Sequence, residues 1–199
     1  MAISDGERVV MGGDSAGSCL SSSPEVYTNA IPKVFRSGSW VVGFVGSWAV
    51  GQVVRHGVEL PPPRPAGELL SQVVTEIVPM VRRALTEAGL TGTGTPQQPE
   101  VWQVLLATSG EMLTFNPRFE VWQPEPRRVA LGSGRLVAYG ALEVLHAQHG
   151  LALETIVERA LDVTSRYVAG VKAPFVLEST VLISRPSKAR SSGTALAHA

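Results

Sequence analysis

The apolar positions of this chain follow two different periods, which alternate in blocks along the sequence. A period of two, or a short continuous apolar run, indicates a strand. The run Trp40 to Val45 is apolar throughout, which is typical of a strand buried on both faces. Asp5-Gly6 is a hairpin-turn signal between the first two strands. The pattern predicts strands at 1–4, 8–11, 40–45, 101–108, 111–115, 119–122 and 175–183, and short strands within 26–35.

A period of three to four indicates amphipathic helices. This pattern predicts helices at 48–56, 69–85, 136–149 and 153–168. Pro79 is expected to kink the second of these helices, and Gly89 is expected to end it. The segment Gly17 to Pro24 is rich in glycine and serine, and we predict a loop there.

The order of these elements indicates the fold class. Strands are followed by two helical segments, further strands, two helices and a last strand. That order is not the strict alternation of a doubly wound parallel sheet. It predicts an α/β (α+β) fold in which two stacked, mainly antiparallel sheets carry helices on both outer faces. We expect one domain at 1–184 and a disordered tail at 185–199, where apolar periodicity is lacking.

Composition narrows the function classes. The 199 residues include 17 basic and 17 acidic ones, so the formal net charge is zero. This balance gives no reason to expect nucleic acid or an acidic membrane as a partner. The N-terminal stretch has no basic segment followed by an apolar one, and no apolar run reaches about 18 residues. We therefore expect a cytoplasmic protein with no membrane partner.

Cysteine and histidine offer little chemistry. Cys19 is the single cysteine of the sequence, and we expect an idle thiol because no base can be placed beside it. His146 and His149 stand three apart on a predicted helix, with no third ligand nearby in the sequence. We expect solvated histidines, no metal site and no cofactor.

The segment 9–18 has two competing interpretations. Gly13, Ser15 and Gly17 match the G-x-S-x-G pattern of serine esterases, in which the serine lies between a strand and a helix. No helical pattern follows Ser15, and no His-Gly-Gly-type oxyanion motif precedes it. The esterase interpretation is therefore a distant alternative.

The second interpretation is a resemblance to the proteasome β-subunit family, nearest to its bacterial HslV-like branch. Residues 9–14 are similar to the family's apolar-apolar-x-Ala/Gly-Gly-Asp, and 42–47 resemble its Gly-Phe-Ala-Gly turn into a helix. Residues 129–134 are close to its Ala-Ile-Gly-Ser-Gly-Gly. Two further segments, at 32–34 and 158–163, follow the family's order. The likeness spans residues 1 to about 183, and it indicates a divergent member.

The resemblance implies a four-layer α/β/β/α N-terminal-nucleophile (Ntn) hydrolase that assembles into a homo-oligomeric ring. In that family an N-terminal threonine attacks the peptide carbonyl, with its own α-amine as base. The resemblance makes Asp14 the acid that orients Lys33, and Lys33 the lysine beside the nucleophile. It makes Gly43 the oxyanion amide and Ser133 the serine near the N-terminal amine. It also implies a peptide or unfolded-protein substrate and an ATPase unfoldase as partner.

Each of these residues also has a purely structural interpretation. Asp14 suits a turn, Lys33 suits the surface, and Gly43 suits a close-packed neighbour. Ser133 suits the cap of the helix that follows it. The sequence alone leaves these interpretations open for each residue taken singly, and the ordered set of motifs favours the family roles.

The chain departs from the family pattern at the nucleophile. Counted back from Asp14, the family's threonine falls three residues before Met1. Val50 replaces an acid that follows the family's Gly-Phe-Ala-Gly turn, and 167–172 contain no second acid to support Ser133. Either a leading segment supplies the threonine, or the chain is a catalytically silent structural subunit with the same fold.

Overall fold

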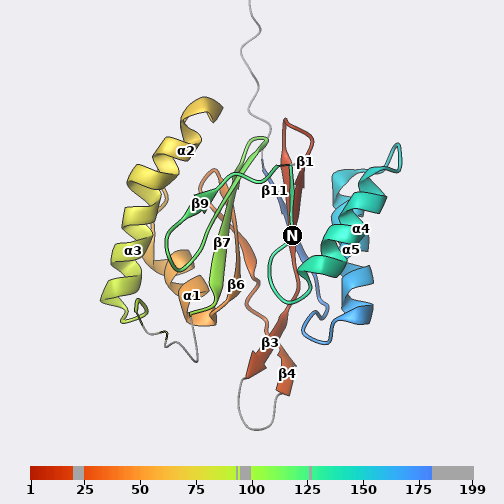
Figure 1. Ribbon diagram of the computed structural model, residues 1–199, viewed down its shortest axis with the longest axis horizontal. Coiled ribbons are helices and arrows are strands. Elements are labelled where there is room, and N and C mark those ends of the chain that lie inside the picture. The colour runs from red at the N-terminus through yellow and green to blue at the C-terminus, as the bar shows by residue number, and fades with distance from the viewer. Residues whose placement is uncertain (20–24, 93, 95–99, 126, 181–199) are drawn as a thin grey trace, which may run out of the picture.

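The protein forms two β-sheets stacked face to face between two helical layers (Figure 1). The computed structural model describes residues 1–19, 25–92, 94, 100–125 and 127–180. Every strand pair in these ranges is antiparallel. The two stacked sheets with helices on both outer faces, expected from the order of elements, are therefore confirmed, and so is the four-layer α/β/β/α sandwich that the resemblance implies. The expected tail at 185–199 lies outside the described residues.

The strands divide into two stacked sheets and a separate hairpin. In spatial order, the larger sheet contains β5 (Val34–Ser37), β6 (Trp40–Gly46), β7 (Trp102–Thr108), β8 (Glu111–Phe115) and β9 (Val121–Trp122). The smaller sheet contains β10 (Arg128–Val129), β1 (Ala2–Ser4), β2 (Val9–Gly13) and β11 (Val176–Ser179). The hairpin consists of β3 (Ala16–Cys19) and β4 (Glu25–Thr28).

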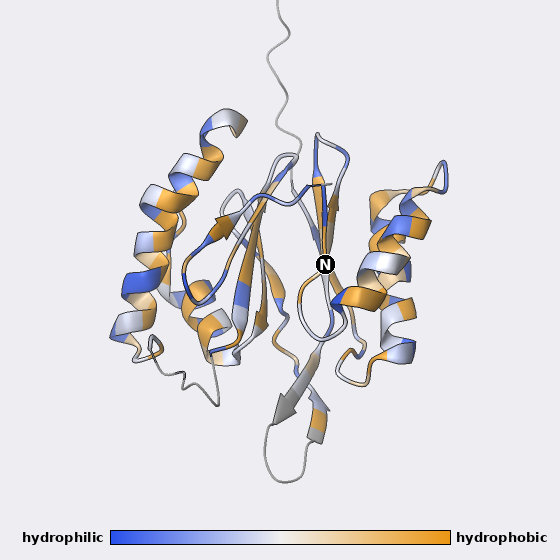
Figure 2. Ribbon diagram, viewed as in Figure 1, coloured by the Kyte–Doolittle hydropathy of each residue, from blue (hydrophilic) through white to orange (hydrophobic). Residues whose placement is uncertain are grey.

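Each sheet has its own helical cover. The larger sheet is covered by α1 (Trp48–Gly57), α2 (Leu69–Gln72) and α3 (Val78–Glu87), with a 3₁₀ turn at Ala66–Glu68 and a π-helical turn at Val73–Ile77. The smaller sheet is covered by α4 (Arg135–His146) and α5 (Leu153–Tyr167). Figure 2 shows apolar residues along the inward faces of these helices, as amphipathic helices require.

Alternation along β1 shows how the sequence builds the layers. Ala2 and Ile3 are both fully buried, but they belong to different clusters. Ala2 packs between the two sheets with Met11, and Ile3 packs beneath α5 with Val157. Successive side chains of a strand point to opposite faces, so a strand in an inner layer needs apolar residues at both positions.

The helix predicted at 69–85 is interrupted differently from a simple kink. The N–H of Val78 donates to the carbonyl of Val73, five residues back, and this bond closes the π-helical turn. Pro79 follows directly. Its nitrogen has no hydrogen to donate to the carbonyl of Thr75, which an α-helix would require. The spacing of the helical hydrogen bonds therefore widens from four residues to five next to the proline.

The predicted loop from Gly17 to Pro24 is wrong for its first part. Gly17 lies in β3, where it pairs with Tyr27 of β4. Gly17 has no side chain, and the Tyr27 ring packs against it, since an added Cβ would lie 2.5 Å from a ring carbon.

Within the described residues, no helix is both long enough and apolar enough to span a bilayer.

Candidate active site

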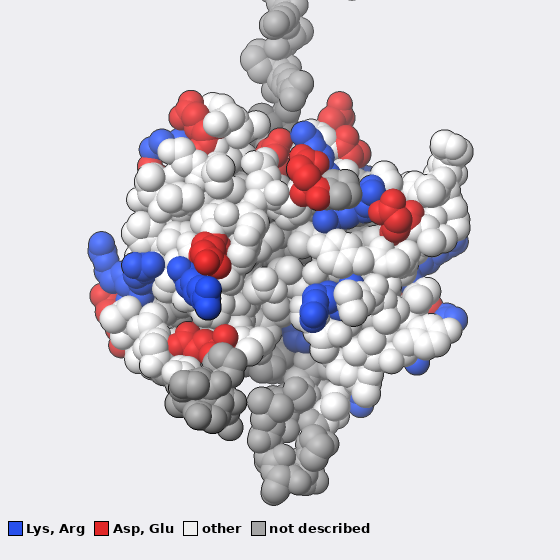
Figure 3. Space-filling model, viewed as in Figure 1, with Lys and Arg blue, Asp and Glu red and all other residues white. Residues whose placement is uncertain are grey.

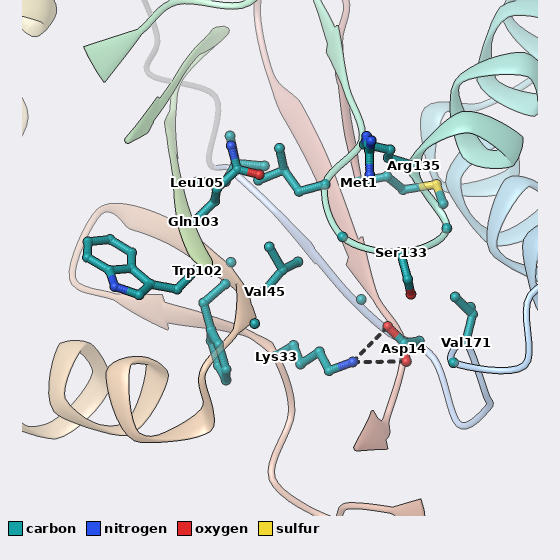
Figure 4. Close-up of a pocket in the computed structure, with 18 of the residues that line it drawn as sticks. Met1, Asp14, Lys33, Val45, Trp102, Gln103, Leu105, Ser133, Arg135 and Val171 are labelled. Carbon is teal, nitrogen blue, oxygen red and sulfur yellow. Dashed lines mark hydrogen bonds and ion pairs between the residues drawn. The ribbon is translucent and has the colours of Figure 1, made fainter. Parts of the chain in front are cut away.

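A pocket of about 670 Å³ opens between the two sheets where β2 ends. Its walls come from distant parts of the chain: the end of β2, the β5–β6 hairpin, β7 and the loop before α4 (Figure 4). All four predicted site residues line it, namely Asp14, Lys33, Gly43 and Ser133. The fold therefore brings together residues that the sequence places more than a hundred positions apart.

Asp14 and Lys33 form a two-pronged ion pair within this pocket. Asp14 directly follows β2, and Lys33 directly precedes β5. The Lys33 Nζ donates to both carboxylate oxygens of Asp14 at 3.0 Å, and the two side chains are only 16% and 15% exposed. Asp14 Oδ2 also accepts from the Ala16 N–H at 2.8 Å. Asp14 thus makes both its turn contact and its lysine contact, and Lys33 is not a surface lysine.

Trp48 covers another side of the lysine. The Lys33 Nζ lies 5.7 Å from the centre of the Trp48 ring, within cation–π range. Trp48 is itself held by an edge-to-face contact with Phe44, with ring centres 5.4 Å apart. No sequence pattern indicates this contact, because an aromatic residue that opens a helix does not reveal which polar group it covers.

Ser133 lies in the loop that carries β10 into α4. It is exposed at the pocket, and Figure 4 shows it on the same side as Asp14. Its side chain does not cap α4, since Gly134 is the capping residue and no side chain bonds there. A side chain at Gly134 would meet the Cγ2 of Thr164 at 2.6 Å, so glycine allows this loop to lie close against α5.

Strand register decides which amides of β6 face the pocket. The N–H of Phe44 donates to the Lys33 carbonyl at 3.0 Å, so Phe44 points its amide toward β5. Amides alternate between the two neighbours of an antiparallel strand. The Gly43 amide therefore faces β7, where Gly43 pairs with Leu105. By the same alternation, the Gly46 amide points to the same side as the Phe44 amide, past the N-terminal end of β5. Gly46 is exposed at the pocket.

Both glycines are required by close contacts. A side chain at Gly43 would meet the sulfur of Met11 at 2.6 Å, in the layer between the sheets. Gly46 has φ +84°, and a side chain there would lie 2.0 Å from the Val101 carbonyl oxygen. The backbone at Gly46 is thus closed to residues other than glycine.

Ser15 is buried rather than presented. It is 2% exposed, its hydroxyl donates to the Pro174 carbonyl at 2.6 Å, and its N–H donates to the Lys172 carbonyl at 2.9 Å. The chain continues from Ser15 into strand β3, not into a helix. This geometry does not fit a nucleophile elbow, so Ser15 holds the turn.

The backbone of Met1 continues the pairing of β1. The Met1 nitrogen donates to the Gly12 carbonyl at 2.8 Å, and the Gly12 N–H donates to the Met1 carbonyl at 2.8 Å. Burial lowers the pKa of the Met1 amine from 8.0 to about 6; nearby Asp14 opposes this shift, and Lys33 adds to it. The β1 strand therefore leads into the surroundings of the Asp14–Lys33 pair.

Neither the charges on one face of the molecule nor a group of metal ligands marks a second site among the described residues. The face shown in Figure 3 carries both signs interspersed over its described residues, in keeping with the zero net charge. Within the part of the chain that the structure describes, no three His, Cys, Asp or Glu side chains are grouped to hold a metal. His146 and His149 are exposed at the end of α4 and beyond it.

Comparison with known proteins shows a likeness in structure. No protein-family model matches the chain, and no curated protein sequence matches it. Among solved structures, BPH from Thiobacillus denitrificans in complex with epoxomicin superposes with a TM-score of 0.73 at 16% identity. That match covers 92% of this chain and 97% of the BPH chain.

Two further structures extend the likeness. The eukaryotic HslV of Trypanosoma brucei matches with a TM-score of 0.60 at 20% identity, over 89% of this chain and 96% of its own. The Anbu complex of Pseudomonas aeruginosa, solved as a helical assembly, matches with a TM-score of 0.61 at 17% identity. That match covers 89% of this chain and 79% of the Anbu chain. The chain therefore has the proteasome-like Ntn-hydrolase fold that its motifs indicated, at low sequence identity.

Proposed function

We propose that this chain is a subunit of a proteasome-like oligomeric assembly whose pocket hydrolyses peptide bonds with an N-terminal threonine. The observation that carries the proposal is the Asp14–Lys33 pair, held two-pronged at 3.0 Å in a pocket into which β1 leads. A lysine–carboxylate pair of this kind, 16% and 15% exposed, costs solvation and serves chemistry better than stability.

The strand register supports a position for the proposed threonine. Met1 pairs with Gly12, so the position three residues earlier would stand opposite Ser15, about 10 Å further along the strand. It would share the orientation of Ala2, whose side chain lies between the sheets. A threonine at that position would direct its hydroxyl toward the Lys33 side of the pocket.

The chemistry follows from the groups around that position. The threonine hydroxyl attacks the substrate carbonyl carbon and passes its proton to the α-amine of the same residue. The Lys33 ammonium favours the alkoxide that forms, and Asp14 holds the ammonium in place. We assign the oxyanion to the N–H of Gly46, since the register directs the Gly43 amide to β7. The amine proton passes to the leaving nitrogen as the C–N bond breaks, which leaves the acyl group as an ester on the threonine oxygen. Water then hydrolyses this ester, which releases the acid and restores the threonine hydroxyl.

A catalytically silent structural subunit is the second candidate. It is favoured by the lack of any carboxylate in 167–172 beside Ser133, and by Val50 in place of an acid. An ATPase unfoldase as partner is a proposal that follows from the resemblance, and a cytoplasmic location is one that follows from the sequence pattern.

A register test separates the two candidates. Chains would be prepared with a first-residue threonine either three or two positions before Met1, with intact mass confirming each N-terminus. We expect peptide hydrolysis and a covalent epoxomicin adduct from the three-residue form only, because a shift by one residue turns the side chain toward the helices. Equal inactivity of both forms would support the silent subunit.

The lysine gives the second arm of this test. In the active form, we expect Lys33→Ala to lower kcat by about 100-fold or more, because the group that favours the alkoxide is lost. Lys172→Ala is the matched control, since Lys172 is exposed and its Nζ makes a long hydrogen bond, at 3.5 Å, to the Val26 carbonyl. Unchanged kcat in Lys33→Ala would contradict the role assigned to Lys33.

A further inference from the structure

Arg135 is a charged residue of the pocket lining that has no ionic partner among the described residues. The charged lining residues are Asp14, Lys33, Glu100 and Arg135. Asp14 and Lys33 neutralise each other, and Glu100 accepts from the Trp102 Nε1 and the Gly94 N–H. No carboxylate of the described residues lies within 4.0 Å of Arg135. Of the two basic side chains that line the pocket, Lys33 is therefore paired with a carboxylate, and Arg135 has none beside it among the described residues.

Arg135 lies on the wall of the pocket that carries Ser133. Arg135 is the first residue of α4 and follows Ser133 by two positions. It is exposed, and Figure 4 shows it among the lining residues near Met1 and Ser133. In this chain Gly132-Ser133-Gly134 is followed by Arg135. The family motif Ala-Ile-Gly-Ser-Gly-Gly has its last glycine at that position. The charge is therefore an addition of this chain to the pattern it resembles.

Helix stability does not account for the arginine. A cation in the first turn opposes the helix dipole, and α4 has no acidic residue in its first turn to compensate. A residue that is unfavourable for its own helix and unpaired at a pocket is explained by an anion that binds from outside.

We propose that Arg135 is a specificity-determining residue that binds a carboxylate of the peptide substrate, on the α4 side of the scissile bond. This inference rests on the proposed function, and it names the substrate class. The other walls of the pocket include Val45, Leu131 and Val171. The preferred substrate is thus an apolar peptide segment with an aspartate or glutamate next to the cleaved bond.

The test uses the chain led by threonine and blocked octapeptides of alanine and leucine. Three matched peptides carry glutamate, glutamine or lysine at each position in turn around the cleaved bond. Exposed ion pairs of this kind are modest, so we expect kcat/KM for the best glutamate peptide to exceed that of its glutamine partner about fivefold at low salt. Added salt of about 0.5 M should reduce the ratio.

Variants assign the effect to one side chain. Arg135→Ala should abolish the glutamate preference while hydrolysis of the glutamine peptide persists, and Arg135→Glu should favour the lysine peptide. Arg159→Ala is the matched control, because Arg159 is an exposed arginine of α5 outside the pocket. A glutamate preference that survives in Arg135→Ala overturns the inference and leaves the proposed function standing.

A binding measurement distinguishes a failure of the proposed catalysis from a failure of the role proposed for Arg135. Fluorescein-labelled forms of the same peptides would be titrated against the chain that begins at Met1, which needs no nucleophile to bind. Tighter binding of the glutamate peptide that is lost in Arg135→Ala supports the inference even if no peptide is cleaved. Equal binding of all three peptides contradicts it.

Discussion

The amine of Met1 shows how the pocket acts on a single charge. In a chain that begins at Met1, this amine is buried and its pKa falls from 8.0 to about 6. The unfolded chain therefore binds the proton more tightly than the folded one, and protonation favours unfolding. The penalty is fully present below pH 6 and disappears above pH 8.

This difference predicts a stability that rises with pH. Two pKa units correspond to roughly 3 kcal/mol, so the free energy of unfolding should increase by up to that amount between pH 6 and 8. Urea unfolding at a series of pH values measures it, with intact mass confirming that Met1 is retained. An N-acetylated chain is the control, because it has no amine to titrate. The same pH slope in both chains would show that another group causes it.

Single residues also show how far sequence reasoning reached. Asp14, Lys33 and Ser133 were identified from ordered motifs, and the structure places them around one pocket. Gly46 and Arg135 were not singled out. The direction of the Gly46 amide depends on which carbonyl Phe44 bonds, and the pairing of Arg135 depends on which carboxylates lie near it in space. Neither fact can be obtained from local sequence.

Among the elements, the interrupted helix over the larger sheet is open to direct test. Pro79 is exposed, and it follows the π-helical turn at Val73–Ile77. Alanine at this position would restore an N–H for the Thr75 carbonyl, which allows a continuous α-helix. A proline inside a helix costs about 3 kcal/mol, and part of the gain is offset by the freer unfolded chain.

We therefore expect Pro79→Ala to raise the free energy of unfolding by about 1–2 kcal/mol. Thermal unfolding of both chains measures the change. Pro65→Ala serves as control, since Pro65 precedes the 3₁₀ turn at Ala66–Glu68, where proline suits the backbone. A lower melting temperature for Pro79→Ala would mean that the π-helical turn is fixed by packing and not by the proline.

At the level of the whole molecule, the layers were predictable and the pocket was not. Apolar periods and the order of elements predicted two sheets with helices on both outer faces, because each element must bury its apolar side. The pocket arises where β2, the β5–β6 hairpin and the loop before α4 meet. Those contacts join positions as distant as Lys33 and Ser133, so only a resemblance to known motifs connected them beforehand.

The outward face of α4 argues for assembly of whole chains. Leu136 and Val144 are 76% and 65% exposed, and Tyr139 and Gly140 lie on the same face between them. Glu143 is the charged residue of that face, and Arg128 already pairs with it at 2.8 Å. An apolar face of this kind on a helix marks a protein contact. We predict that a second copy of this chain covers it, in keeping with the oligomeric assembly proposed above.

We expect the protein at micromolar concentration to sediment as an oligomer, and Leu136→Glu with Val144→Glu to shift it to smaller species. Charges placed in an apolar contact lose hydration without gaining a partner, which is strongly unfavourable for association. Leu70→Glu is the matched control, because Leu70 is 45% exposed on the opposite helical layer. Unchanged sedimentation of the double variant would exclude the α4 face, and a monomeric parent chain would contradict the assembly itself.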